Sequence, residues 1–514
     1  MDICCRIART REYLRTALRN PAIVILQLVL TGSLAGLGSG CASAEPAPVV
    51  NERGAVGDYP MEIVSLEIPL RDEMHFAHQP VSTDSDTAQA YHDQGLTYLQ
   101  AYEGLEAARS FHAALRHDSE LALAWLGLSD AYIRLRDREA AIEALELAEA
   151  HSETAETERE RDWLKLRGEF RATEDSFSDW DEAERDDFLE RLEAAAERHP
   201  QAPEFRYFLG RLSSGEESVA WHQEILSIDT DHPGAHHELT HAFERKPEKV
   251  SLAVYHGERL AKLASQSAHA VHMFGHNAGR VGRMDDAVAA FEAADRIERS
   301  LAEEGVPLEH IGHHTHNLSF LALALYHQGE NERLDAVLER LQAQSEREDH
   351  DMRRLMAPVL EANLRMGQGN WERLDEIASE VEDEEAPGAG VLAKTYRSVV
   401  ALGECEINTA RSHFDEAQDR MEEKDLPNQL RRPKLIPQAV LAMDDGDDAL
   451  FEEALEQFAD DSNPHLWIRA HPNLDALAEL LVANGHSDKA ARARAVLAEH
   501  DPFYRGGEAA GDGG

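Results

Sequence analysis

A repeat of 34 residues constrains the fold of this chain more than any other feature of its sequence. The segments "YHDQGLTYLQAYEGLEAARSFHAAL" and "WLGLSDAYIRLRDREAAIEALELA" can be laid over each other, with matched positions 34 residues apart. The matched residues are Tyr91, Tyr98, Ala107, Phe111 and Ala114, then Trp125, Tyr132, Ala141, Leu145 and Ala148. Small residues let two helices approach, and large ones fill the space between neighbouring pairs, so each pair needs its neighbours to bury its apolar face.

This period and this pattern are typical of tetratricopeptide (TPR) repeats. The spacing of small and large residues returns at Ala287, Phe291 and Ala294, and again at Ala410, Phe414 and Ala417. Further helix pairs are predicted at 203–228, 233–263, 315–341, 352–380, 436–458 and 473–498. Aromatic residues make up 6% of the chain, which favours helices over strands. We therefore predict an all-α fold, a right-handed superhelical solenoid of TPR-like antiparallel helix pairs.

Composition divides the chain into predicted segments. An acidic stretch that ends in "APGAG" near 380–390 predicts a break in the array. The segments are a lipoprotein-type signal peptide at 1–40, a flexible tether at 41–60, an N-terminal extension with the first TPR units at 61–150, a divergent TPR array with a histidine-rich groove at 151–380, C-terminal TPR-like helices at 391–500 and a disordered tail at 501–514.

The N-terminus has the layout of a secretory signal. Five arginines precede the apolar run "PAIVILQLVLTGSLAGLGSG", and Cys41 follows directly. A cysteine at this place is typical of the lipid acceptor of a bacterial lipoprotein. We expect a lipid anchor at Cys41 and a location in the cell envelope, on the periplasmic side of a membrane. Ordinary secretion to the periplasm and an uncleaved anchor remain as alternatives.

Charge and cysteine content limit the partners and the covalent chemistry. The net charge of −47 argues against nucleic acid, whose phosphates need a basic surface. Once 1–40 is removed, Cys41 and Cys405 are the only cysteines left, so no disulfide framework is expected. We expect a protein or peptide ligand, bound on the concave surface that repeat arrays offer.

Histidines gather on the predicted first helices of three successive units. His269, His272 and His276 are spaced by three and four residues, and so are on one helix face. Counted within the repeat, they stand second, fifth and ninth, where side chains face the groove. His237 and His241 precede them, and His316 follows in the next unit. Imidazoles gathered in this way suit a transition metal such as zinc. Hydrogen-bonded structural histidines and a metal-free acid/base or ligand site are the alternatives.

One stretch, "HELTH" at 237–241, matches the H-E-x-x-H pattern of zinc proteases. There two histidines bind the ion and the glutamate activates water, which makes Glu238 a candidate general base. Candidates for a third ligand are His269, His272 and Glu258. A TPR array lacks the sheet that usually holds the substrate of such proteases, so a binding scaffold is the competing interpretation.

Several stretches resemble a group of bacterial TPR lipoproteins that share HPGAxHxxxHAxE and HxxHMxxH motifs. The matching stretches are "HQPVSTDSDTAQAYHDQGL", "HPGAHHELTHAFE", "AHAVHMFGHNAGRVGRMDDAVAAFEAA" and "HNLSFLALALYHQG", within His75 to Leu341. The motif positions matched are His237, His241, Glu244, His269, His272, Met273, His276, Arg280, His316 and Asn317. Three places depart from the pattern: Glu238 replaces a tyrosine, Ser319 replaces a histidine, and "YEGLEA" at 102–107 replaces a more usual "FNHxEA". The resemblance implies a TPR fold and no particular reaction.

Two functions follow as hypotheses. The first is a lipid-tethered scaffold whose groove binds a protein or peptide. The second is a metal-binding protein or a metal-dependent, hydrolase-like enzyme that uses the histidine cluster. In the first, hydrogen bonds to the ligand are expected from Arg280, Asn277, Glu244, Asn317 and Ser319. Whether the protein is an enzyme stays open at this point.

Overall fold

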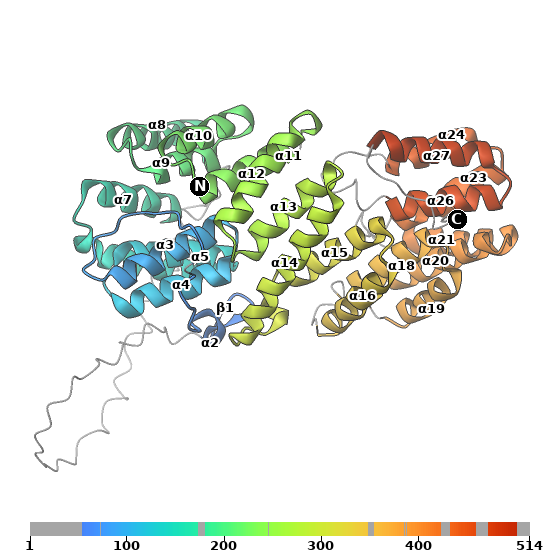
Figure 1. Cartoon of the computed structure of the whole chain (residues 1–514), viewed down its shortest axis with the longest axis horizontal. Coiled ribbons are helices and arrows are strands. Elements are labelled where there is room, and N and C mark those ends of the chain that lie inside the picture. Colours follow the sequence, from blue (N-terminus) through green and yellow to red (C-terminus); the bar gives the residue numbers. More distant parts are fainter. Residues whose placement is uncertain are drawn as a thin grey trace, which may run out of the picture. The chain divides into compact units, whose positions relative to one another are not determined.

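The computed structural model describes residues 54–71, 73–172, 180–244, 246–347, 354–384, 386, 388–422, 432–458 and 471–500. Within these ranges the chain is helical almost throughout, and its strands form one short antiparallel pair (Figure 1). The predicted signal peptide, Cys41 and the predicted tail at 501–514 lie outside the described residues. The all-α prediction is confirmed.

The N-terminal elements begin with the strand pair and continue into the first repeats. They are β1 (Ala55–Val56), β2 (Tyr59–Pro60), α2 (Met61–Val64), α3 (Asp86–Gln100), α4 (Gly104–His117), α5 (Ala122–Arg134), α6 (Arg138–Ala150), η1 (Ser152–Thr154), α7 (Glu158–Ala172) and α8 (Glu182–Arg198). Helices α3 to α6 are the two units recognised from the 34-residue period.

The central helices carry the histidine-rich part of the chain. They are α9 (Pro203–Leu212), α10 (Gly215–Ile228), α11 (Pro233–Glu244), η3 (Pro247–Lys249), α12 (Val250–Leu263), α13 (Ala268–Arg280), α14 (Met284–Glu303), η4 (Leu308–His310), α15 (His314–Gln328) and α16 (Asn331–Ser345). Consecutive helices pack against each other throughout this series, as a solenoid of helix pairs requires.

The C-terminal helices continue the same architecture. They are α18 (Met356–Gly367), α19 (Trp371–Glu382), α20 (Ala389–Gly403), α21 (Ile407–Glu422), η5 (Arg432–Lys434), α23 (Leu435–Asp444), α24 (Asp448–Phe458), α26 (His471–Ala483) and α27 (Ser487–His500). All six additional helix pairs predicted from the sequence coincide with pairs in the structure. The acidic stretch near 380–390 joins α19 to α20, and these two helices pack together rather than marking a break.

Small residues stand where the repeat pattern predicts close helix contacts. A Cβ atom at Gly127 would lie 2.4 Å from the Phe111 ring, and one at Gly95 would lie 2.8 Å from it. The same relationship returns in the central repeats, where a Cβ at Gly275 would lie 2.7 Å from Phe291. The fully buried phenylalanine of the second helix therefore packs onto the bare backbone of the first.

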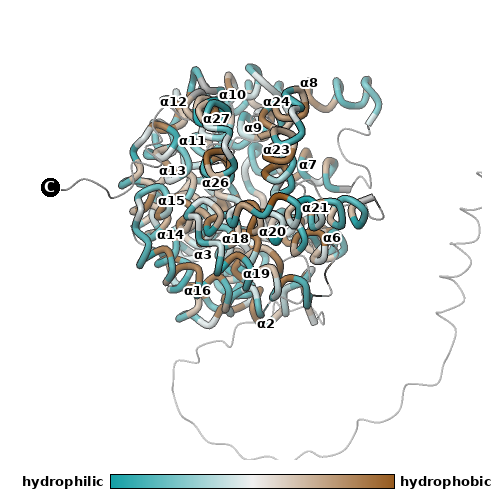
Figure 2. Tube along the Cα trace, turned by 90° about the vertical axis from the view of Figure 1, so that its right-hand side faces the viewer, coloured by the Kyte–Doolittle hydropathy of each residue, from teal (hydrophilic) through white to brown (hydrophobic). Residues whose placement is uncertain are grey.

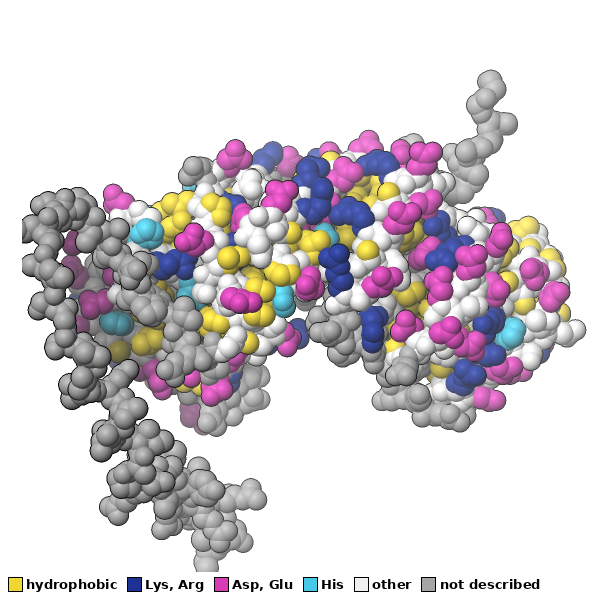
Figure 3. Space-filling model, turned by 90° about the horizontal axis from the view of Figure 1, so that it is seen from below, with side chains coloured by type: hydrophobic (Ala, Val, Ile, Leu, Met, Phe, Trp, Pro, Cys, Tyr) yellow, Lys and Arg dark blue, Asp and Glu magenta, His cyan; other side chains and the backbone are white. Residues whose placement is uncertain are grey.

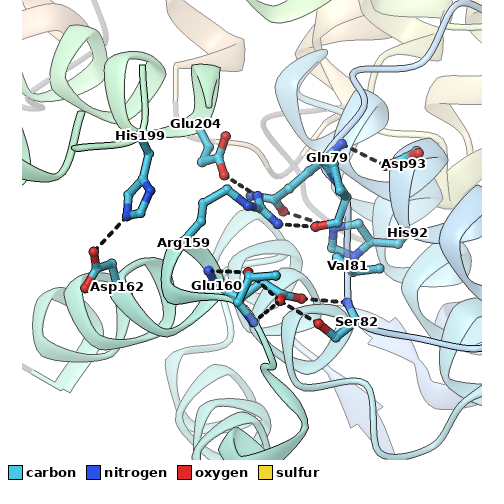
Figure 4. A network of polar contacts seen from close by, with 12 residues as sticks. Gln79, Val81, Ser82, His92, Asp93, Arg159, Glu160, Asp162, His199 and Glu204 are labelled. Atoms are coloured by element: carbon cyan, nitrogen blue, oxygen red, sulfur yellow. Dashed lines mark hydrogen bonds and ion pairs between the residues drawn. The ribbon is translucent and has the colours of Figure 1, made fainter. Parts of the chain in front are cut away.

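The segment before α3, with the sequence "HQPVST", binds across the surface of the first helices (Figure 4). The carboxylate of Glu160 on α7 accepts hydrogen bonds from the backbone N–H and the hydroxyl of Ser82, both at 2.6 Å. The backbone N–H of Gln79 donates a hydrogen bond to the carboxylate of Asp93 on α3 at 3.0 Å. The segment thus ties α7 to α3, whose last residues support the site described below.

Hydrophobic and hydrophilic residues are interspersed along the helices drawn in Figure 2, as expected where one face of a helix packs against its neighbours. Asp and Glu side chains are scattered over the face drawn in Figure 3, with Lys and Arg between them. Among the described residues, no helix combines the length and the apolar character needed to cross a membrane.

Candidate metal centre

Helices α11, α13 and α15, together with the residue just before α15, bring seven histidine rings into one continuous row. Successive rings along this row have centroids 4.3–5.0 Å from each other. The step from His313 to the rings that follow it is longer. The row contains the six histidines predicted from the sequence, His237, His241, His269, His272, His276 and His316, together with His313. Helical spacings of three and four residues place the pairs on α11 and α13 on common faces.

The first triad consists of His237, His241 and His269. The Nε2 atom of His237 lies 3.0 Å from Nε2 of His241 and 3.1 Å from Nε2 of His269. His237 is fully buried and His269 is 6% exposed, whereas the His241 side chain is 25% exposed. The three nitrogens therefore converge on one point that is open to solvent on the His241 side.

The other ring nitrogens of α11 are held by acceptors. Nδ1 of His237 lies 2.7 Å from the backbone carbonyl oxygen of Gln100, and Nδ1 of His241 lies 2.7 Å from Oε1 of Glu244. A carbonyl oxygen only accepts, so Nδ1 of His237 carries the proton and its Nε2 presents a lone pair. The ionised form of Glu244 has the same effect on His241. Such outer partners are characteristic of metal-binding histidines.

The lone pair on Nε2 of His237 is approached by two other ring nitrogens at once. One sp² nitrogen accepts one well-directed hydrogen bond, so ordinary hydrogen bonding accounts for only one of the two contacts. A cation at the meeting point would attract all three nitrogens together. Two nitrogens bound to tetrahedral zinc at 2.0–2.1 Å lie about 3.3 Å apart, close to the spacing observed here.

Burial keeps two rings of the first triad, His237 and His269, neutral. Burial and the neighbouring His241 lower the pKa of His237 to about 3. Burial, together with His313 and the other rings, also lowers the pKa of His269 well below its usual value. Neutral imidazole is the form that binds metal, so these rings are ready to bind at neutral pH without first losing a proton.

Tyr102 covers the first triad from the turn between α3 and α4. Its ring is stacked on His241 at 5.8 Å and meets His237 edge-on at 4.4 Å. The residue has a φ of 67°, in the left-handed region that costs energy for a side chain of this size. The guanidinium of Arg134 lies 3.9 Å from the centre of the ring on which it stacks. The sequence patterns alone do not mark Tyr102 as part of this site.

Glu238, the predicted general base, has its carboxylate bound elsewhere. Its Oε1 accepts hydrogen bonds from the hydroxyls of Tyr102 at 2.9 Å and Tyr207 at 3.2 Å, and from Arg211 at 2.9 Å. Burial acts to raise its pKa, but Arg211 and His237 outweigh burial and lower it to about 2. In this environment the Glu238 carboxylate is suited to positioning Tyr102 and is poorly suited to accepting a proton from water. Glu258 is paired with Lys262 and Arg283.

The second triad consists of His272, His276 and His316. One nitrogen from each ring lies within 4.8 Å of the other two. Nδ1 of His272 lies 2.8 Å from Oδ1 of Asn317. The amide of Asn317 in turn donates to the carbonyl of Phe291 at 2.9 Å, which fixes the orientation of the amide. Nε2 of His272 is therefore the nitrogen with the lone pair.

His313 lies between the triads. Its ring centroid is 4.5 Å from that of His269, 6.2 Å from that of His272 and 5.5 Å from that of His316. Its Nδ1 is buried and has no hydrogen-bond partner. His313 was not predicted from the sequence, because it stands just before α15, at the N-cap, where helical spacing gives no signal.

The residues predicted to bind a ligand in the groove lie mostly inside the protein. Glu244, Asn277 and Asn317 are at most 3% exposed, and Ser319 is 9% exposed. Asn277 donates to the carbonyl of Met273 at 3.0 Å, and Ser319 donates to that of Thr315 at 2.8 Å. Arg280 binds the backbone carbonyl of Glu244. These side chains therefore bond mainly within the fold, where Glu244 and Asn317 orient histidines, and Oδ1 of Asn277 is buried without a hydrogen-bond partner.

A third group of potential ligands combines two residues of α14 with the first residue of α15 and was not identified from the sequence. It combines Asp295, Glu298 and His314, all buried. Oε2 of Glu298 lies 3.2 Å from Nδ1 of His314, and its Oε1 has no hydrogen-bond partner. Asp295 already forms ion pairs with Arg299 and Arg340. These arginines neutralise Asp295, so this group suits a cation less well than the histidine triads do.

The chain matches no protein-family model and no curated protein sequence. Solved structures with a similar fold include a Rap protein complexed with competence and sporulation factor. The match covers 74% of this chain and 98% of the Rap chain, at 12% sequence identity and a TM-score of 0.43. The match to the Cut9–Hcn1 hetero-tetramer of APC/C covers 81% of this chain and 84% of the matched chain, at 12% sequence identity and a TM-score of 0.30. The match to the TPR domain of P58(IPK) covers 81% of this chain and 98% of that domain's chain, at 12% sequence identity and a TM-score of 0.20.

Proposed function

We propose that this protein is a helical-repeat scaffold of the cell envelope that binds a transition-metal ion through His237, His241 and His269. The observation that carries the proposal is the convergence of three Nε2 atoms, with contacts of 3.0 and 3.1 Å centred on His237. Two of these rings have their other nitrogen held by Gln100 and Glu244. Nitrogen ligands favour zinc, copper, nickel or ferrous iron over magnesium or calcium.

The fourth position on the ion would be open. Tyr102 covers the triad but its hydroxyl is committed to Glu238, so it is not placed as a ligand. The partly exposed side of His241 is then the route by which water or a side chain from a partner reaches the ion. An open position is a feature of ions that bind or act on an external group. Because Glu238 is held by Arg211 and two tyrosines, binding is a better-supported role than hydrolysis.

The test is the metal content of the purified mature chain after dialysis. We expect the wild-type protein to retain zinc or copper, and the double variant His237→Ala, His241→Ala to lose the ion of this triad. His112→Ala is the matched control, since His112 is also buried but bonds to Tyr132, away from the row. A bound ion stabilises the folded chain, so a chelator should lower the melting temperature of the wild type and of the control only. Equal metal content in all three proteins would exclude the proposal.

The scaffold part of the proposal is supported by an apolar pair on α12. Leu252 is 43% exposed and Tyr255 is 61% exposed, and their spacing of three residues puts them on one helix face. Exposed aromatic and aliphatic side chains of this kind are common at protein–protein contacts. A partner recovered from envelope extracts by the wild type should be lost with Leu252→Ser, Tyr255→Ser. If the same partner is recovered by both proteins, this surface is not its binding site.

The envelope location is part of the same proposal and has its own test. Changing Cys41 to Ser would remove the predicted lipid acceptor. The variant should move from the membrane fraction to the soluble fraction, whereas Cys405→Ser should remain with the membrane. An unchanged distribution of Cys41→Ser would mean that the N-terminal segment does not direct lipidation.

A further inference from the structure

We propose that the histidine row is a two-ion centre, in which His272, His276 and His316 hold a second transition-metal ion beside the first triad. This inference rests on the proposed function of the first triad and adds a second site, its ligands and a connecting residue. The chemistry expected is that of a borderline ion such as zinc or copper, because the second triad again offers imidazole nitrogen alone.

The geometry of the second triad repeats that of the first. The ring centroid of His272 is 4.3 Å from that of His276 and 4.9 Å from that of His316, and the last two are 5.9 Å apart. The three ligand nitrogens lie within 4.8 Å of one another. Small rotations of the rings would bring them to the spacing of about 3.3 Å that a tetrahedral ion requires.

The environment of these rings is dry and preorganised. His272 and His276 are at most 2% exposed, while His316 is partly exposed. The ring of Phe320 lies 4.1 Å from that of His276, and the ring of Phe291 lies 5.0 Å from that of His272. An apolar wall of this kind limits solvent access to a bound ion and strengthens its attraction to the ligands.

Asn317 orients His272 in the second triad, as Gln100 and Glu244 orient histidines of the first triad. Its amide is fixed by the carbonyl of Phe291, so its Oδ1 accepts the Nδ1 proton of His272. Each triad therefore contains at least one histidine whose Nε2 lone pair is oriented by a buried acceptor bound to its Nδ1. The sequence pair His316-Asn317 supplies a ligand and an orienting residue from adjacent positions on α15.

His313 connects the two triads. Its ring approaches His269 in the first triad and both His272 and His316 in the second. Its Nδ1 is buried without a hydrogen-bond partner, and its side chain does not cap α15 although it occupies the N-cap position. A molecule or ion lying between the triads would give this nitrogen a partner. His269 and His272 also face each other in a near-parallel stack at 6.5 Å.

The experiment titrates the full mature chain with Cu²⁺, measures bound copper after desalting, and records electron paramagnetic resonance spectra. We expect two ions in the wild type, one in His237→Ala, His241→Ala, one in His272→Ala, His276→Ala, and none in the combined variant. Magnetic coupling between the two ions should reduce or split the signal of the wild type, and each half-loaded variant should show an isolated Cu²⁺ spectrum. His112→Ala should behave as the wild type.

The outcomes separate this inference from the proposed function. One ion in the wild type, lost only when the first triad is changed, overturns the two-ion centre and leaves the proposed function standing. One ion lost only with the second triad overturns the proposed site, and the pair with it. Two uncoupled ions would refute the paired centre. Circular dichroism and melting of the metal-free variants identify any that fail to fold, and in that case His276→Gln replaces the second double variant.

Discussion

The backbone N–H of His269 donates to Oε1 of Glu103 at 3.1 Å, which ties the start of α13 to the N-terminus of α4. Oε2 of the same carboxylate is buried and has no hydrogen-bond partner. Burial and the nearby Glu106 raise the pKa of Glu103 to about 8. A buried acid that keeps its proton therefore lies directly behind a predicted metal ligand.

Glu103 should make the metal-free protein less stable as the pH rises from 6.5 to 8. Within this window the folded chain keeps a proton that the unfolded chain has released, because the ordinary pKa of the group is 4.5. The contribution is at most about 1.4 kcal/mol per pH unit. Histidines such as His237, with a pKa lowered to about 3, act in the opposite direction but only below 6.5.

Denaturant unfolding at a series of pH values measures this slope. Glu103→Gln retains an oxygen that accepts from His269 and cannot ionise, so the slope between pH 6.5 and 8 should become shallower. Glu73→Gln, at an exposed position, should leave it unchanged. The same slope in Glu103→Gln and wild type would show that another group holds the proton.

Gly234 should control the metal affinity of the first triad without touching an ion. A Cβ atom at this position would lie 2.4 Å from Oε1 of Gln100, whose backbone carbonyl holds Nδ1 of His237. Gly234→Ala must displace the end of the Gln100 side chain, and the Tyr207 ring, 2.9 Å from the added Cβ, leaves it little room. The resulting strain should reach the backbone carbonyl of Gln100 and weaken metal binding by at most about 10- to 100-fold, the usual effect of losing an outer partner. Competition with a chromogenic chelator gives the affinity.

The control for this change is Gly168→Ala on α7. Its nearest neighbour would be Oε1 of Glu149 at 3.4 Å, so the helix should gain up to about 1 kcal/mol and keep its metal affinity. Unchanged affinity in Gly234→Ala would mean that the Gln100 side chain moves aside without shifting the backbone carbonyl that holds His237.

The sequence predicted the helix pairs and six of the seven histidines because both depend on local periodicity. Phe111 and Gly127 reveal their contact through a spacing that any repeat of this kind requires. His237 and His241 share a face because a helix turns once in 3.6 residues. Such features need no knowledge of the partner helix, so they can be read along the chain.

The residues that the sequence did not reveal act across long separations. Gln100 supports His237 through its backbone carbonyl, which leaves no trace in the residue type. Tyr102 reaches the triad from a turn with an unusual φ, and His313 from the N-cap of a helix. Glu244 and Asn317 were identified, but as ligand-binding groups, because burial is decided by neighbouring helices.

Replacing Glu238 by Gln tests whether this residue positions other groups or acts as a base. We expect the metal content to remain within threefold of the wild type, because the carboxylate bonds to Tyr102, Tyr207 and Arg211 rather than facing the three nitrogens. We also expect a loss of about 1–3 kcal/mol in the free energy of unfolding, since buried hydroxyls lose a charged acceptor.

Glu224→Gln is the matched change on the surface. Glu224 pairs with Arg206 but its side chain is 56% exposed, so the loss should stay below about 0.5 kcal/mol. A Glu238→Gln protein of full stability that loses its metal would contradict the assignment and return Glu238 to the metal site itself.

Glu160 should be the main anchor of the "HQPVST" segment. Its carboxylate accepts from the N–H and hydroxyl of Ser82, and from the N–H and hydroxyl of Thr157 at 3.0 and 2.6 Å. Burial acts to raise its pKa, but these donors outweigh burial and lower it, so its stabilisation is present above the unfolded value of 4.5 and is lost as the pH falls below it. Glu160→Gln should therefore cost about 2–3 kcal/mol at pH 7 and much less at pH 3, as measured by denaturant unfolding. Glu158→Gln, exposed on the same helix, should cost little at either pH.

Because the segment is bound to α3 and α7 together, protease cleavage near Ser82 should become faster in Glu160→Gln alone. Equal cleavage rates in both variants would show that the segment is held by its other contacts.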